Sequence, residues 1–545
     1  MAKKQKMYFS NNNIYIYIYI YSWIIILLLW VGLIIFSYWI NIYSQWKFTT
    51  NTYSPIVCKI LLVFNFIFVS SLYCSSIKNF IFTLAYLFFY KRKNSRYVYT
   101  VIENKSLDII LKKNPMVFVL YTTCNDFDSI ALKKSLYQTY QNCKFFILDD
   151  SNDSKYKDEI DKFAYEYNIE VIRRKNRKGF KAGNINNFLM NRNDYDYFVL
   201  LDSDEIIPKD YILKVLPYFS NKKVGIVQCN NKCNRQNNYF DYLGSYVHNT
   251  QWNTEYVVRH SLGVVNCCGH GATISKKMYL DVGGFPELIL EDWALTLNGL
   301  KFGYETVYAP EIVCWEEFPT NYLAFKKRNY RWTQGGVQCF SKIGWKLLFF
   351  NSCPFFRRLD LLLTQTNYFI SIGSLIIVLS TLSILAPMGF RFRYENWYVA
   401  VTLFFAIIPL LNCFIYYLGK VNFFKLIVIL LFFYILYASL FVSVIISIFE
   451  ALIGKKLNFV VTPKKETKRI SFIDAIKFNI IELIVGVILI IALIISFIYI
   501  PNINFFTYVW VIILIIPMFL TVPLTLMSNI KLKNKNHEME NKYVI

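Results

Sequence analysis

The sequence Tyr-Phe-Val-Leu-Leu-Asp-Ser-Asp occupies residues 197–204 and joins an apolar run to two carboxylates. A short apolar run of this kind predicts a buried strand. Asp202 and Asp204 stand where that strand ends, the edge at which open α/β sheets bind ligands. Two carboxylates at i and i+2 can hold a hard cation, Mg²⁺ or Mn²⁺, that bridges substrate phosphates. The pair alone is weak evidence, because turns also favour aspartate.

Further apolar runs around this strand alternate with amphipathic segments. Strands are predicted at 116–121, 145–148, 169–172 and 224–228. Helices are predicted between them, for example at 129–140 and 158–167. Strands that alternate with helices indicate a doubly wound α/β sheet. We therefore expect one Rossmann-like domain over residues 98–350.

Outside this region the composition is that of a membrane protein. Of the 545 residues, 55% are hydrophobic and 17% are charged, whereas soluble proteins carry about 25% charged residues. This composition excludes a disordered chain, a collagen-like chain and a small disulfide scaffold. The net charge is +23, but many basic residues border apolar runs, where lipid headgroups and the positive-inside rule account for them. We expect a lipid bilayer as a partner and no nucleic acid.

Apolar runs flank the predicted α/β domain on both sides. They lie at 14–40, 55–90, 361–390, 396–419, 426–449 and 483–530. We interpret 55–90 as one long helix, with two spans as the alternative, and 483–530 as two spans hinged near Pro501. The sequence thus predicts a multi-pass α-helical membrane protein. Its membrane regions are 1–97 and 351–530, and a polar tail follows at 531–545.

Basic residues also set the expected orientation. Lysines before the first apolar run place the N-terminus in the cytosol, and two spans return the α/β domain to that side. The basic segment 455–477 would lie outside if 426–449 crossed the membrane. We therefore interpret 423–453 as an interfacial or re-entrant helix, followed by a cytosolic loop at 454–474. The α/β domain and both termini are expected on the cytosolic side of the plasma membrane.

Other candidate residues follow strands or begin helices. Asp149 and Asp150 follow the strand at 145–148 and can accept hydrogen bonds from a nucleobase or ribose, although a turn would also use them. Lys181 lies in the sequence Lys-Ala-Gly-Asn at the end of a cationic run, where it can meet phosphate. A solvated face is the common alternative for such a run.

Two acidic residues, Glu291 and Asp292, begin a predicted helix at 293–300. Acidic residues often stabilise a helix start, but an aspartate can also take a proton from an attacking hydroxyl. Arg331 and Trp332 alone would suit a helix on the membrane surface. The chain has 12 Cys, none in a C-x-x-C pair, and 4 His. A metal site built from these residues is not expected.

Taken in order, these motifs resemble those of the membrane-bound processive glycosyltransferases of family 2, above all cellulose synthase catalytic subunits. Mannan and glucomannan synthases are also similar. The resemblance covers about residues 113–345 and, beyond them, the sequence Phe-Val-Val-Thr-Pro-Lys at 459–464. That sequence fits a loop that closes over the nucleotide-loaded site in the family. Two positions depart from the pattern. Leu290 replaces a threonine, and Arg328 replaces a glutamine that contacts the acceptor.

The resemblance implies an inserted cytosolic glycosyltransferase domain of GT-A type that inverts the anomeric centre. Donor binding is implied for seven residues: Asp149, Asp150, Lys181, Asp202, Arg331, Thr462 and Lys464. Asp202 and Asp204 are implied to hold Mg²⁺ or Mn²⁺, and Asp292 to act as the base. Trp332 and Glu291 are implied to meet the acceptor.

The expected donor is a nucleotide sugar, most simply UDP-glucose, and the expected product is a cellulose-like β-glucan. The growing polysaccharide would leave through the following spans, with accessory export subunits as further partners.

Several alternatives stay open. A mannan, glucomannan, hyaluronan or chitin synthase would share these motifs and use another sugar. A non-processive transferase that glycosylates a lipid carrier would share the aspartate motifs, but would not need the Arg331-Trp332 motif and many downstream spans. A transporter without catalysis predicts charged residues inside the spans, and most of the spans are uncharged.

Overall fold

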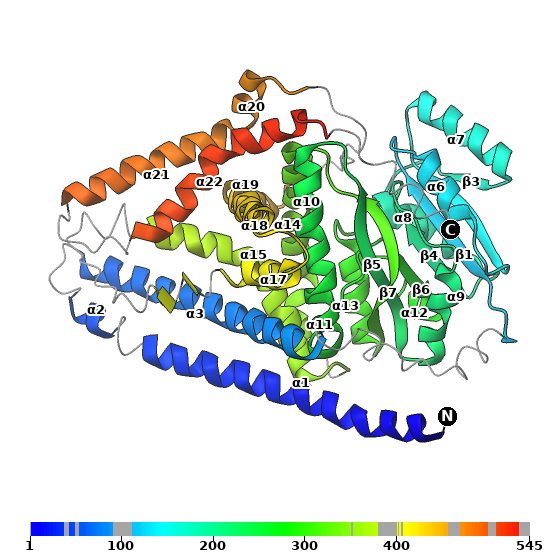
Figure 1. Ribbon diagram of the computed structural model, residues 1–545, viewed down its shortest axis with the longest axis horizontal. Helices are drawn as coiled ribbons and strands as arrows, with labels where there is room; N and C mark the ends of the chain where they lie inside the picture. Colours follow the sequence, from blue (N-terminus) through cyan, green and yellow to red (C-terminus); the bar gives the residue numbers. More distant parts are fainter. Residues whose placement is uncertain are drawn as a thin grey trace.

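The computed structural model describes residues 2–37, 43–48, 54–90, 112–349, 352–379, 400–401, 403–404, 407–455, 469–499 and 508–532. A sheet with its covering helices lies at the right of Figure 1, and long apolar helices lie at the left. The predicted loop at 459–464, with Thr462 and Lys464, lies outside the described residues. The tail beyond residue 532 lies outside them as well.

The described strands form one mixed sheet in the order β3-β2-β1-β4-β6-β5-β7. Their bounds are β1 Val117–Thr123, β2 Cys143–Asp149, β3 Glu170–Arg173, β4 Tyr197–Leu201, β5 Val224–Arg235, β6 Ala272–Ser275 and β7 Glu305–Glu317. Strand β6 is antiparallel to β4 and β5, and the other pairs are parallel. The predicted α/β sheet is confirmed, with an antiparallel strand that was not expected.

Helices cover both faces of the sheet, because successive side chains of a strand point to opposite faces. Val117, Val119 and Tyr121 share one buried cluster with side chains of α6 (Ser129–Leu136), α7 (Ser154–Tyr167) and α9 (Tyr211–Val215). Phe118 and Leu120 share the other with α8 (Phe180–Leu189), α12 (Lys276–Asp281) and α13 (Glu291–Lys301). Burial on both faces is typical of a parallel sheet.

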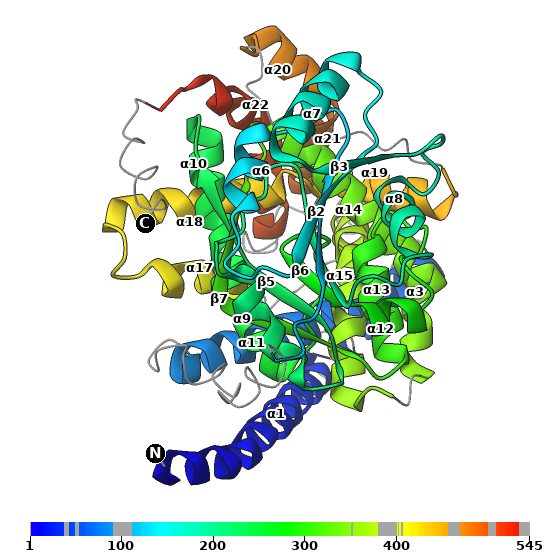
Figure 2. The same ribbon diagram turned by 90° about the vertical axis from the view of Figure 1, so that its right-hand side faces the viewer.

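Three helices lie between the sheet and the apolar helices (Figures 1 and 2). They are α10 (Tyr239–Asn253), α11 (Glu255–Leu262) and α14 (Tyr322–Lys342). Side chains of α11 share a buried cluster with those of the N-terminal apolar helices, and side chains of α10 share one with the C-terminal ones. The ligand-binding edge predicted for the sheet therefore lies on a scaffold that is continuous with the apolar helices.

The remaining helices are mostly apolar. Their bounds are α1 Ala2–Ser37, α2 Tyr43–Phe48, α3 Pro55–Ala85, α15 Phe355–Leu379, α17 Ile408–Tyr417, α18 Phe423–Ala438, α19 Phe441–Leu452, α20 Phe472–Phe478, α21 Ile480–Tyr499 and α22 Val509–Leu526. Short 3₁₀ turns occur at Leu216–Ser220, Gly344–Phe349 and Met527–Asn529, and a π-helical turn at Tyr86–Tyr90 extends α3. Among the described residues, 5 stretches are long and apolar enough to cross a membrane.

The stretch interpreted as interfacial consists of α18 and α19, separated by a turn at Ser439 and Leu440. Figure 1 shows both helices nearly end-on, whereas α1, α3 and α21 run across the page. The pair therefore runs crosswise to these apolar helices, as a helix in the membrane plane would. The same stretch is also long enough to span, and its interfacial placement stays a prediction.

A buried ion cluster joins the apolar helices to α11. Lys78 Nζ of α3 donates to Asp360 Oδ1 of α15 at 3.1 Å, and Arg259 Nη2 of α11 donates to Asp360 Oδ2 at 2.9 Å. The backbone N–H of Val264 also donates to Asp360 Oδ2, at 3.0 Å. Because a buried charge without its partner is strongly destabilising, the three segments depend on one another for their position.

Candidate active site

Lys181 and Asp202 meet at the carboxyl edge of the sheet. Asp202 directly follows β4, and Lys181 lies in the first turn of α8, which begins after Gly179 at φ 73°. Lys181 Nζ donates to Asp202 Oδ1 at 2.5 Å and to the carbonyl oxygen of Gly269 at 2.8 Å. Burial opposes the charge on Lys181, but Asp202 and its acidic neighbours outweigh burial and raise the pKa. The ammonium is therefore a fixed positive charge beside the Asp-Ser-Asp turn.

Glu291 and Asp292 form the start of α13 and face the same edge. The backbone N–H of Trp293 donates to Asp292 Oδ1 at 2.7 Å. A Cβ added at Gly269 would lie 3.0 Å from Asp292 Oδ2, so the backbone there lies directly against the other carboxylate oxygen. Burial raises the pKa of Asp292, and burial together with Asp292 raises that of Glu291 to about 8. The two carboxylates titrate as a pair.

Arg331 brings a second positive charge from α14. Burial lowers its pKa, and the attraction of Glu291, Asp202 and Asp292 opposes that shift. The structure thus brings together Lys181, Asp202, Glu291, Asp292 and Arg331. These five predicted residues form a charged cluster. They come from four separate segments of the chain and place opposite charges at one edge of the sheet.

The second carboxylate of the turn, Asp204, is buried. Its Oδ2 accepts a hydrogen bond from the backbone N–H of Glu317 at 2.9 Å. Between the two aspartates, Ser203 Oγ donates to Asp126 Oδ2 at 2.6 Å, and the Ser203 carbonyl oxygen accepts from the Tyr121 hydroxyl at 2.5 Å. The turn is therefore held by β1, by the loop that follows β1 and by the end of β7.

The oxygen donors of this turn suit a hard divalent cation. In the part of the chain that the structure describes, no group of three or more His, Cys, Asp or Glu side chains is arranged to hold a metal. Mg²⁺ is commonly held by one or two carboxylates together with the phosphates of its substrate. Asp202 and Asp204 fit this mode, in which the diphosphate of a donor completes the set of ligands.

Asp149 ends β2 and Asp150 follows it, and each carboxylate pairs with an arginine. Arg173 Nε donates to Asp149 Oδ2 at 2.7 Å. Arg174 donates to both oxygens of Asp150, at 2.9 and 2.6 Å. Arg174 also donates to a backbone carbonyl just before Lys181, at 2.6 Å. Asp150 is therefore connected to Lys181 through Arg174, whereas no direct contact of either aspartate with the charged cluster is observed among the described residues.

Trp332 lies on α14 and is 40% exposed. Arg328, one turn earlier on the same helix, places its guanidinium carbon 4.6 Å from the centre of the indole. The opposite side of α14 contacts the apolar helices. Tyr330 donates a hydrogen bond to Glu450 of α19, and Lys326 forms an ion pair with a glutamate of α21. Helix α14 therefore connects the charged cluster to the predicted membrane region.

Sequence reasoning missed a group of buried charged residues beneath the turn. His270 lies between Glu205 and Glu316, at 3.6 and 3.7 Å. His248 Nε2 lies 2.6 Å from Glu316 Oε1. Burial opposes the charge on His270, but Glu316 and Glu205 outweigh it and raise the pKa to about 10. The one available signal was that Glu205 continues the Asp-Ser-Asp motif.

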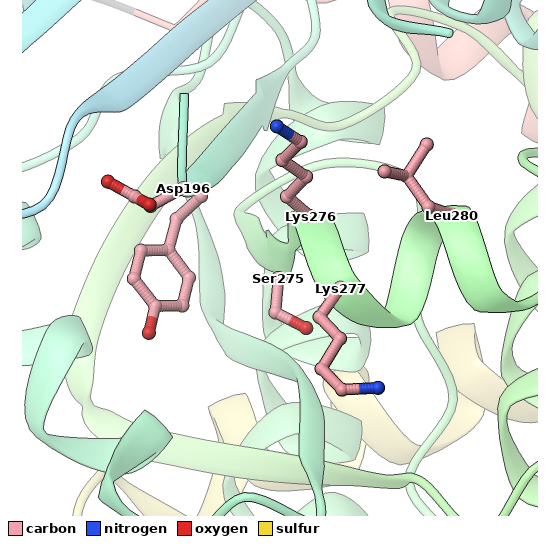
Figure 3. Close-up of a pocket in the computed structure, with 6 residues that line it drawn as sticks. Asp196, Ser275, Lys276, Lys277 and Leu280 are labelled. Carbon is pink, nitrogen blue, oxygen red and sulfur yellow. The ribbon is translucent and has the colours of Figure 1, made fainter. Parts of the chain in front are cut away.

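A surface pocket of about 370 Å³ lies at the other end of β4 (Figure 3). Asp196, Ser275, Lys276, Lys277 and Leu280 line it. Both lysines are already engaged, one with the backbone and side chain of residue 193 and the other with Asp281. The candidate catalytic residues therefore lie elsewhere, at the carboxyl edge of the sheet.

Comparison with known proteins identifies the class of domain. Residues 197–453 match the model of glycosyl transferase family group 2. The match begins at β4 and includes Asp202, Asp204, Glu291, Asp292 and Arg331. The chain therefore carries a glycosyltransferase domain of GT-A type, built on a mixed sheet and joined to helices that are able to span a membrane.

Similar curated proteins come from Oryza sativa subsp. japonica. Probable glucomannan 4-beta-mannosyltransferase 6 is 27% identical over 229 residues, which are 39% of this chain and 39% of that protein. Probable glucomannan 4-beta-mannosyltransferase 3 is 26% identical over 233 residues, which are 40% of this chain and 41% of that protein. The similarity thus spans about two fifths of the length of these relatives.

A solved structure is also similar in part. It is the mannosyltransferase PcManGT from Pyrobaculum calidifontis in complex with GDP-Man and Mn²⁺, with a TM-score of 0.45 and 16% identity. The similarity covers 71% of this chain and 100% of that one.

Proposed function

We propose that this protein is an inverting, processive hexosyltransferase that extends a β-linked polysaccharide from a nucleotide sugar. The observation that carries the proposal is the convergence of Asp292 with the Lys181–Asp202 pair. A base for the acceptor hydroxyl and a positive charge for the leaving diphosphate then lie at one edge of the sheet. These are the two groups that an in-line sugar transfer requires.

Asp292 is proposed as the base. Its Oδ1 is engaged by the N–H of Trp293 at 2.7 Å, and its Oδ2 is proposed to accept the proton of the attacking hydroxyl. Burial raises the pKa of Asp292, which makes its carboxylate a better proton acceptor. Glu291, beside it, is proposed to contact the acceptor and to limit the charge that the pair carries.

The donor is proposed to lie between Lys181 and Arg331, whose positive charges offset the charge that develops on the leaving diphosphate. Asp202 and Asp204 would hold Mg²⁺ or Mn²⁺, which would neutralise part of the same charge. Lys181 keeps Asp202 in place through the 2.5 Å contact. The nucleoside is proposed to lie toward Asp149 and Asp150. Donor binding by Thr462 and Lys464, which lie outside the described residues, stays a prediction.

Processivity is proposed from the place of α14. The helix carries Arg331 and Trp332 at the charged cluster and is bonded to α19 and α21 on its other side. A glycan held on the exposed indole of Trp332 would therefore start at the entrance to the apolar helices. We propose that catalysis takes place at the cytosolic face of the plasma membrane and that the polymer leaves through these helices, with accessory export subunits as partners.

The proposal also concerns the identity of the transferred sugar. The names of the rice relatives favour a mannosyl unit of a glucomannan, so GDP-mannose is the first donor to test. The motif pattern of the sequence favours UDP-glucose, the second donor. Either donor fits the same base and the same charges, because the residues above recognise the diphosphate and the attacking hydroxyl.

The test uses the purified full chain in detergent or nanodiscs with each donor, Mg²⁺ or Mn²⁺, and a β-linked oligosaccharide primer. Nucleotide release and product size are measured, and linkage-specific mannanases and glucanases digest the product. The expected result is a long β-linked polymer, absent with Asp292→Asn. A single sugar added to a lipid would contradict processivity, and the absence of transfer from any nucleotide sugar would contradict the function.

A further inference from the structure

Arg328 lies in an aromatic environment between the catalytic edge and the apolar helices. Its guanidinium carbon is 4.6 Å from the ring centre of Trp332 and 5.4 Å from those of Phe318 and Phe325. Arg328 precedes Trp332 by four residues on α14, so both side chains lie on one face of the helix. An arginine that stacks on an aromatic ring gains a cation–π attraction, which is strongest for tryptophan.

The hydrogen bonding of Arg328 is incomplete. Among the described residues, its Nε is buried and has no hydrogen-bond partner. Burial lowers the pKa of Arg328, whereas the carboxylate of Glu316 opposes that shift. The guanidinium is thus held by ring faces and by the charge of Glu316. A glutamine at this position is shorter and neutral, and it could not supply the same attraction.

Trp332 keeps 40% of its surface exposed although Arg328 packs against its ring. An indole that is braced by a neighbouring side chain and still partly accessible offers an apolar surface on which the C–H groups of a sugar can pack. The guanidinium removes rotational freedom from the indole before the sugar arrives, which reduces the entropy lost on binding.

We propose that Arg328 is a positioning residue for the acceptor, which holds the indole of Trp332 in the orientation that receives the growing glycan. The proposal rests on the proposed function, because it takes Trp332 as the acceptor platform. Arg328 itself acts through Trp332. The loss of Arg328 should therefore weaken the acceptor step and leave the donor step intact.

The first measurement compares Arg328→Gln, Arg328→Lys and the control Lys327→Gln. Lys327 is an exposed neighbour on the same helix, so its substitution removes a charge without touching the ring. Arg328→Gln should raise the KM for the primer about 2- to 30-fold, the range of a cation–π contact, with the KM for the donor and acceptor-free donor hydrolysis unchanged. The primer KM of Arg328→Lys should lie between those of the wild type and Arg328→Gln, and the primer KM of Lys327→Gln should match that of the wild type.

The second measurement reports on the ring without any reaction. The emission of Trp332 is obtained by subtracting the signal of the Trp332→Phe counterpart from that of each protein, and its quenching by acrylamide is then measured. Arg328→Gln should make Trp332 easier to quench, and its effect on primer KM should vanish when Trp332 is replaced by alanine. This readout distinguishes failure of the inference from failure of the proposed function, because it requires no sugar transfer.

Two results would overturn the inference. One is unchanged quenching of Trp332 in Arg328→Gln. The other is a fall in donor hydrolysis as large as the fall in transfer, which would make Arg328 part of the donor site or of general stability. If Arg328→Gln fails to fold, Arg328→Lys keeps the charge and is judged by the same two readouts.

Discussion

Replacing Gly269 by alanine should separate the placement of Asp292 from the stability of the fold. Gly269 has φ +79°, and an added Cβ would lie 3.0 Å from Asp292 Oδ2. Gly283 is a matched control, because it has φ +80° and an added Cβ would meet nothing within 4 Å. Both substitutions place alanine in the left-handed region, which should lower the free energy of unfolding by about 1–2 kcal/mol in each case.

Of the two substitutions, only Gly269→Ala places a new atom against the carboxylate of the proposed base. A Cβ at 3.0 Å from Asp292 Oδ2 requires that carboxylate to shift by a few tenths of an ångström. A misplacement of 1 Å costs about 10²-fold in rate, so the smaller shift should lower kcat by roughly 3- to 10-fold. Gly283→Ala should leave kcat unchanged.

Thermal unfolding of the purified variants measures the first effect, and initial rates of nucleotide release measure the second. We expect equal losses of Tm and a loss of kcat in Gly269→Ala alone. Equal losses of kcat in both variants would refute the reasoning, because the effect would then come from backbone strain. Full kcat in a folded Gly269→Ala protein would remove Asp292 Oδ2 from the reaction.

Four further outcomes are expected. Asp292→Asn should lower turnover about 10²- to 10⁴-fold while calorimetry shows intact donor binding; near-normal turnover would exclude the base. Since burial raises the pKa of Asp292 and the pKa of Glu291 is raised to about 8, activity should rise with pH above the usual carboxyl range. Glu291→Gln should leave that rise in place, because burial and not Glu291 raises the pKa of Asp292; a rise that moves to lower pH would contradict this assignment. Asp204→Ala should lose metal-stimulated donor binding, and full activity in excess chelator would exclude this metal site. In a background without accessible thiols, a single cysteine introduced by Glu466→Cys should resist an impermeant thiol reagent on intact cells, whereas ready labelling would show that residues 423–453 span.

The sequence pattern predicted the strands that carry apolar runs. It did not predict strands whose formation depends on pairing with a neighbouring strand. Strand β4 was predicted with its observed bounds, because a run of five apolar residues ends at Leu201, directly before Asp202. Strand β6 has the sequence Ala-Thr-Ile-Ser, in which polar residues separate the apolar ones, so it presents no apolar run. Strand β7 contains Pro310, which falls where its register with β5 shifts, between the partners Ala309 and Val313. A proline cannot donate to the ladder, so β7 becomes a strand only through its neighbour.

The candidate site shows the same division. The motif residues could be named in order, but their partners depend on tertiary structure. His270 stands between two glycines and gives no periodic signal, and its place between Glu205 and Glu316 requires the folded sheet. The need for glycine at position 183 of the Lys-Ala-Gly-Asn motif is visible only in the folded structure. An added Cβ would lie 2.0 Å from the carbonyl oxygen of Lys178.

The ion cluster around Asp360 has a consequence for how the protein folds during translation. Asp360 follows Lys78 by 282 residues, so a ribosome that adds about 5–20 residues per second needs roughly 15–60 s to deliver the partner of that lysine. Through this interval, the first apolar helices carry a cation without its carboxylate. Their final packing must therefore wait until the whole sheet domain has been translated. A nascent chain stopped before residue 360 would leave Lys78 and Arg259 without the carboxylate that joins them in the complete protein.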